Sequence, residues 1–145
     1  MSAAPAAAGY SGTPLVNKLG LKDGQRVLFL DLPASLDELA TARHFAESER
    51  AGWGDLTTFH NRDVVHGFTA SRAVLHDKGK ALMDAITRDG MVWISWPKKA
   101  SKLPTDITED VIREVLLPTG LVDVKVCAVD EIWSGLKLVI RKELR

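Results

Sequence analysis

The sequence has 145 residues, of which 46% are hydrophobic and 26% are charged, a composition typical of one globular domain and not of a disordered chain. Its 19 basic and 19 acidic residues cancel, so only a local patch could attract nucleic acid or anionic lipid. The single cysteine, Cys127, excludes an intrachain disulfide, and no apolar run approaches the roughly 20 residues that span a bilayer. We therefore expect a cytoplasmic protein without a membrane partner, with a disordered tail at residues 1–9 and one α/β domain over residues 10–145.

The first half of the chain predicts a buried strand and then a helix. Arg26–Leu30 is a continuous apolar run bounded by turn residues, which is typical of a strand covered on both faces. Ser35 and Glu38 have the spacing of a capping box and predict the start of a helix. Residues 46–62 have no clear periodicity, and within them residues 55–59 are expected to form at most a short edge strand.

The second half repeats this order. Residues 63–69 predict a second buried strand, after which Ser71 should cap a longer helix that Gly90 closes. Residues 91–96 predict a third strand, and Thr108 should cap the next helix.

The last two apolar segments, residues 121–129 and 136–141, alternate between apolar and polar positions and are separated by a short turn, so they should pair as an antiparallel hairpin. The whole order predicts a three-layer, Rossmann-like α/β fold: a mostly parallel sheet that ends in an antiparallel hairpin. This order is similar to the second half of the class I methyltransferase fold, a likeness of architecture that does not define an activity.

Ligands of open parallel sheets bind beyond the carboxyl ends of the strands, so the polar residues at that edge are the candidate ligand-binding residues. They are Asp31, Ser71, Arg72, Lys98, Lys99, Ser101, Lys102, Asp130, Glu131 and Trp133. The lysine-rich loop could share a phosphate or carboxylate between ammonium groups, hydroxyls and backbone N–H groups. Alternatively, it is a solvated loop that pairs weakly with nearby carboxylates, and the tryptophan either stacks on a ligand or closes the core.

Several chemistries are not expected. The four histidines lack the spacing of metal ligands, no metal site is predicted, and Cys127 in mid-strand is typical of an inert core thiol. The turn after the first strand, Asp31–Leu36, contains no glycine, and Pro33 removes one backbone donor. We therefore predict no cofactor and do not expect S-adenosylmethionine in its usual mode.

Four motifs, at residues 9–15, 105–110, Trp96–Lys102 (WPKKASK) and Gly120–Val139, are long and unusual. With them the chain resembles a bacterial family of short single-domain proteins of unknown function, over essentially all of its length from residue 9. The resemblance implies a stand-alone bacterial domain and supplies no activity, cofactor or catalytic residue.

The leading hypothesis from the sequence is a non-catalytic binding or regulatory domain for an anionic small molecule or partner at the carboxyl edge of the sheet. An enzyme is the less expected alternative: a transferase related to methyltransferases, with an atypical cofactor pose and Asp31, Asp130 or Glu131 as base. A third alternative is a homo-oligomeric interaction module that pairs through the hairpin edge, for example as a homodimer. Nucleic acid is not an expected partner.

Overall fold

A computed structural model describes residues 13–145, so the tail expected at residues 1–9 lies outside the described residues. Six strands form one sheet in the order β2-β1-β3-β4-β6-β5. Their bounds are Arg26–Leu30 (β1), Glu47–Ala51 (β2), Arg62–Phe68 (β3), Ile86–Pro97 (β4), Leu121–Ala128 (β5) and Trp133–Ile140 (β6). The first four strands are parallel to one another, and β6 is antiparallel to both β4 and β5. This confirms the mostly parallel α/β sheet with a terminal antiparallel hairpin.

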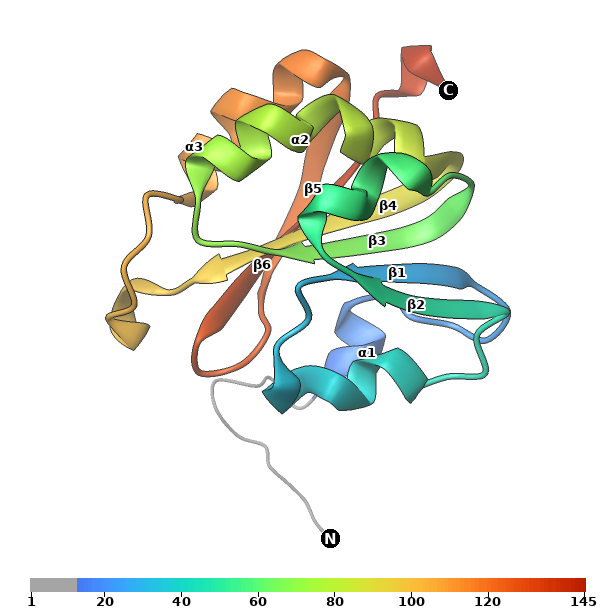
Figure 1. Ribbon diagram of the computed structural model, residues 1–145, viewed down its shortest axis with the longest axis horizontal. Helices are drawn as coiled ribbons and strands as arrows, with labels where there is room; N and C mark the ends of the chain where they lie inside the picture. The colour runs from blue at the N-terminus through green and yellow to red at the C-terminus, as the bar shows by residue number, and fades with distance from the viewer. Residues whose placement is uncertain (1–12) are drawn as a thin grey trace, which may run out of the picture.

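The sheet lies between two layers of helices (Figure 1). One layer holds α1 (Leu15–Lys18) and the 3-10 helix η1 (Ala34–Thr41), and the other holds η2 (Trp53–Thr58), α2 (Arg72–Ala85) and α3 (Glu109–Leu116). Three short 3-10 turns complete the chain: η3 (Lys99–Ser101), η4 (Leu117–Thr119) and η5 (Lys142–Leu144). No helix of the described residues is long and apolar enough to cross a membrane.

Two separate apolar cores form because successive side chains of a strand point to opposite faces. In β1, Val27 and Phe29 belong to the core under α1 and η1, while Leu28 and Leu30 belong to the core under α2 and α3. The continuous apolar run of β1 is thus explained by helices on both faces, as expected.

The prediction of a capping box at Ser35 is wrong. The helix after β1 is a 3-10 helix that begins after Pro33 and has no side-chain cap, and Leu36 interrupts its helical dihedral angles. Ser35 therefore lies inside the helix and not before it. By contrast, Ser71 and Thr108 do cap α2 and α3, each accepting a hydrogen bond from the backbone N–H of the third residue of the helix.

The expectation for residues 46–62 is also wrong. Residues 55–59, expected to be an edge strand, belong largely to η2, and the edge strand of the sheet is Glu47–Ala51. This strand has mostly exposed side chains, so it lacks the apolar pattern by which a strand is recognised in a sequence.

Two element boundaries differ from prediction. The helix that begins after Ser71 ends at Ala85, before Gly90, because β4 begins already at Ile86 and pairs there with Arg62. The second strand of the hairpin begins at Trp133, which pairs with Pro97 of β4. Trp133 is thus a strand residue and does not lie in the hairpin turn.

Candidate functional site

The lysine-rich loop and the β5–β6 turn share one rim of the molecule, as the topology predicted. The backbone N–H of Lys98 donates to the Ile132 carbonyl at 2.7 Å. This contact joins the loop that follows β4 to the turn that precedes β6. The juxtaposition on which the predicted edge site depends is therefore present.

The lysine-rich loop lies at the surface. Lys98 is half-buried, whereas Lys99 and Lys102 are exposed. Ser101 is engaged locally: its hydroxyl donates to the Lys98 carbonyl at 2.7 Å and accepts from the Leu103 N–H at 3.3 Å. Binding of an anion by this loop stays a prediction.

Ser71 and Arg72 take part in the structure of the helix start. The Ser71 hydroxyl accepts from Val74 N–H. The backbone N–H of Arg72 donates to Asp106 Oδ1 at 2.7 Å, and its guanidinium lies 3.3 Å from Glu114. These two residues are therefore occupied with contacts inside the chain.

Asp130 and Trp133 shape the β5–β6 turn. Asp130 Oδ1 accepts hydrogen bonds from the backbone N–H groups of Ile132 at 2.9 Å and Trp133 at 2.7 Å, which is how an aspartate side chain closes a turn. The half-buried Trp133 ring meets the Phe68 ring edge-on, with centroids 5.3 Å apart. This tryptophan closes the core beneath the rim.

The turn after β1 has a left-handed residue although it has no glycine. Asp31 has a φ of 53°, in the region where residues other than glycine are uncommon. Its N–H donates to the Ala51 carbonyl at 2.9 Å, and the next residue, Leu32, is turned into the core. With Pro33 following, this turn lacks the run of free N–H groups that a glycine-rich turn offers to a phosphate or carboxylate.

The strand order reverses between β1 and β3, and such a reversal is the usual ligand position in sheets of this type. Trp53, which follows β2, reaches across to β3: its indole Nε1–H donates to the Phe68 carbonyl at 2.9 Å. A Cβ built on Gly67 would lie 2.4 Å from the Trp53 ring. Only 7% of Trp53 is exposed, so this buried indole packs against β3 at the point of strand reversal.

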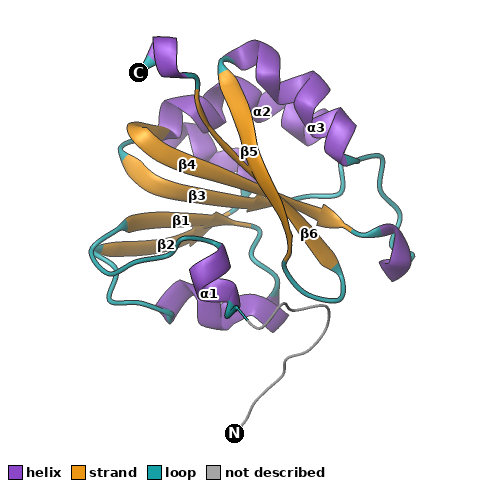
Figure 2. Cartoon of the chain, turned by 180° about the vertical axis from the view of Figure 1, so that it is seen from behind, coloured by secondary structure: helices purple, strands orange, loops and turns teal. Residues whose placement is uncertain are grey.

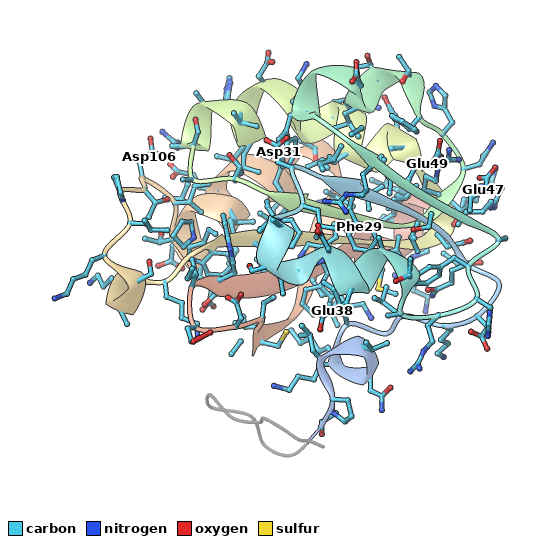
Figure 3. All side chains as sticks on the ribbon, turned by 60° about the horizontal axis from the view of Figure 1, so that its bottom comes forward. Phe29, Asp31, Glu38, Glu47, Glu49 and Asp106 are labelled. Carbon is cyan, nitrogen blue, oxygen red and sulfur yellow. The ribbon has the colours of Figure 1, made fainter. Side chains whose placement is uncertain are left out.

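A pocket of about 420 Å³ lies next to this edge, between α1, η1 and the β5–β6 turn. Its lining residues are Leu15, Val16, Ser35, Leu36, Glu38, Leu39, Asp130 and Glu131. Glu38 lies between η1 and α1 in Figure 3. The volume falls within the usual range of small-molecule sites, roughly 300–1,000 Å³.

The pocket combines apolar walls with three carboxylates, from Glu38, Asp130 and Glu131. None of the described residues that line it is basic, so it favours a ligand with a positive charge and some apolar surface. Of the predicted residues, Asp130 and Glu131 belong to it. Glu38 was noticed in the sequence only for its helix-start spacing, and the pocket depends on how η1 packs against α1, which no local motif signals.

His66 and Ser95 form a polar pair inside the core under η1. His66 Nε2 lies 2.7 Å from Ser95 Oγ, and the imidazole stacks on Phe68. Burial lowers the pKa of His66 from 6.5 to about 3, so the ring is neutral at physiological pH. Neither residue reaches the pocket lining.

Metal ligation has no geometric support among residues 13–145, where no group of three histidine, cysteine or acidic side chains is arranged to hold an ion.

No protein-family model and no curated protein matches the sequence. Solved structures do match the fold. A methyltransferase from Aquifex aeolicus that depends on S-adenosylmethionine (SAM) superimposes with a TM-score of 0.64 and 15% identity over 87% of both chains. The magnesium protoporphyrin IX methyltransferase of Synechocystis PCC 6803 with bound SAM superimposes with a TM-score of 0.61 and 16% identity. The match covers 87% of this chain and 74% of that one.

The cyclopropane synthase MmaA2 of Mycobacterium tuberculosis superimposes with a TM-score of 0.58 and 12% identity, over 79% of this chain and 61% of that one. Two of these three neighbours are methyltransferases and the third is a cyclopropane synthase. At these identities the likeness concerns architecture. This chain has the α/β fold of the class I SAM-dependent methyltransferases.

Proposed function

We propose that this protein is a methyltransferase relative that binds a positively charged, adenosyl-type molecule at the pocket between α1, η1 and the β5–β6 turn. The observation that carries the proposal is the position of three carboxylates around a 420 Å³ pocket beside the carboxyl edge of a methyltransferase sheet. SAM is the first ligand to test, because a solved neighbour holds it.

The usual pose of SAM does not fit this chain. That pose needs a glycine-rich turn after the first strand and an open crevice at the strand reversal. Here Asp31 carries a side chain at the turn, and the Trp53 indole lies against Gly67. The proposal therefore concerns a displaced pose, and no reaction step is derived from it.

The chemistry of the pocket fits the charge of SAM. Its sulfonium and ammonium groups outweigh its one carboxylate, so the molecule carries a net positive charge. Glu38 and Glu131 are exposed carboxylates at the pocket wall, where an opposite charge is attracted. The leucines of α1 and η1 offer apolar surface for the remaining atoms.

Isothermal titration with SAM and with S-adenosylhomocysteine tests this proposal. The second compound lacks the sulfonium charge, so it should bind more weakly than SAM by about tenfold, the effect of roughly 1.4 kcal/mol. Combined substitution of Glu38→Gln and Glu131→Gln should remove this preference, because the charges that discriminate between the two ligands are gone.

Asp37→Asn is the matched control. Asp37 lies on η1 next to Glu38, but it pairs with Arg50 and does not line the pocket. A preference for SAM over S-adenosylhomocysteine that is kept in Asp37→Asn and lost in the Glu38/Glu131 variant supports the proposal. No saturable binding of SAM by the wild-type protein contradicts it, and so does an unchanged affinity of the Glu38/Glu131 variant for SAM.

A further inference from the structure

A row of neighbouring residues crosses five strands on the α1/η1 face of the sheet. Its members, each paired with the next, are Phe29, His66, Trp93, Lys137 and Lys125. The first three are buried in the core. At β6 the row changes from aromatic rings to ammonium groups, because the helical layer does not bury the last two positions: Lys137 is half-buried and Lys125 is exposed.

The two lysines are direct cross-strand partners in the antiparallel pair β5–β6. Side chains opposite each other in such a pair have Cβ atoms about 5 Å apart, and like charges there are destabilising. Lys125 Nζ lies 6.0 Å from the centre of the Trp93 ring, so its side chain leans across β6 toward β4. The sequence thus places two positive charges together at a cost to the fold.

Nothing in the described part of the chain neutralises this charge. Within residues 13–145 no salt bridge joins Lys125 or Lys137 to a carboxylate. The acidic residue nearest to Lys125 along β5, Asp123, pairs with Arg113 of α3 on the opposite face of the sheet. Burial and the neighbouring ammonium groups of Lys125 and Lys22 lower the pKa of Lys137.

From this juxtaposition we infer that Lys125 and Lys137 form a second binding site, independent of the acidic pocket, for a small phosphate-bearing anion. A doubly charged phosphoryl group can neutralise two opposed ammonium groups at once, whereas a carboxylate carries one charge. Lysine binds phosphate as a point charge and needs no fixed geometry. Apolar Val122 and Val139, which are cross-strand partners, lie beside the lysines and can contact an organic part of the ligand.

The probe is inorganic pyrophosphate, with binding measured by isothermal titration and thermal unfolding at constant ionic strength. Lys125→Glu places an opposite charge beside Lys137. This variant should unfold at a higher temperature than the wild type without ligand, and it should bind pyrophosphate at least tenfold more weakly. Lys99→Glu makes the same charge change in the lysine-rich loop and should leave the affinity within twofold.

A second readout needs no variant. Cys127 lies two residues from Lys125 on the same strand, is the only cysteine, and is half-buried. Pyrophosphate should slow its alkylation in the wild-type protein, while chloride at equal ionic strength should not.

Three results would overturn the inference. They are no pyrophosphate binding by the wild type, a loss of pyrophosphate affinity in Lys99→Glu as large as that in Lys125→Glu, and an unchanged rate of Cys127 alkylation at saturating pyrophosphate. Slower alkylation of Cys127 with a single-stranded oligonucleotide, but not with pyrophosphate, would also overturn the inference, in favour of a nucleic-acid surface. These results do not depend on whether the acidic pocket binds SAM.

Discussion

The indole N–H of Trp53 donates to the main-chain carbonyl of Phe68 at 2.9 Å, across the face of Gly67. This contact joins the segment after β2 to the carboxyl end of β3, where a ligand of a methyltransferase-type sheet would otherwise approach. Its consequence is that the Trp53 side chain occupies space beside the carboxyl end of β3.

Gly67 should tolerate no side chain. In Gly67→Ala the new methyl group would lie 2.4 Å from the Trp53 ring, and such overpacking costs about 1–3 kcal/mol or more. Urea unfolding measures this loss. Gly54→Ala is the control, because no atom lies within 4 Å of the added Cβ; it should change stability by less than about 1 kcal/mol. Equal effects of the two substitutions would disprove the close contact.

The left-handed backbone at Asp31 predicts an unusual order of substitutions. Asp31→Gly should leave stability unchanged or raise it by up to about 1 kcal/mol, since glycine adopts a φ of 53° without strain. Asp31→Val should cost about 1–3 kcal/mol, because a β-branched residue is strained there. Denaturant midpoints of the two variants test this, and a valine variant as stable as the glycine variant would count against the assigned conformation.

The His66–Ser95 pair predicts a loss of stability in mild acid. The folded pKa of His66 is lowered from 6.5 to about 3, so between these values the unfolded chain binds a proton that the folded chain does not. The stabilisation is complete above pH 6.5 and falls as the pH drops toward 3, with a slope of up to about 1.4 kcal/mol per pH unit.

Unfolding in urea at pH 7 and pH 4.5 measures this slope. The double variant His66→Phe with Ser95→Ala removes both hydrogen-bonding partners, and it should show a smaller loss between the two pH values than the wild type. His76→Gln, at an exposed position on α2, should retain the full loss. The same pH dependence in all three proteins would contradict the role of His66.

Asp130 has a structural task that can be separated from its charge. Asp130→Asn keeps Oδ1 as an acceptor for the N–H groups of Ile132 and Trp133. The free energy of unfolding of this variant should therefore lie within about 0.5 kcal/mol of the wild-type value. Asp130→Ala leaves both donors without this acceptor and should cost about 1–2 kcal/mol. Thermal unfolding compares the two, and a stable alanine variant would show that the turn closes without this side chain.

The parts of the fold that could be predicted from the sequence are those whose signal is local. The apolar run of β1 and the caps at Ser71 and Thr108 are formed by residues close together in the chain. The polar edge strand Glu47–Ala51 was missed because its side chains are mostly exposed, and its place is set by pairing with β1. Backbone pairing of this kind leaves no apolar pattern.

The candidate site was predicted only in part for a similar reason. Chain order placed the lysine-rich loop beside the β5–β6 turn, and the hydrogen bond from Lys98 to Ile132 confirms this. The wall that Glu38 adds to the pocket depends on the contact of η1 with α1 and the turn, which joins three distant segments. The lysines of β5 and β6 are neighbours only through the register of these two strands, which cross the rest of the sheet steeply in Figure 2.

The most direct test of the proposed pocket is a two-dimensional ¹H–¹⁵N NMR titration of the assigned protein with SAM. We predict that the backbone signals of Ser35, Glu38 and Glu131 shift in a saturable way. The signals of Gly52 and Gly67, at the usual cofactor crevice, should stay in place because Trp53 covers it. Shifts centred on those two glycines, or no shifts at saturating SAM, would contradict the proposed site.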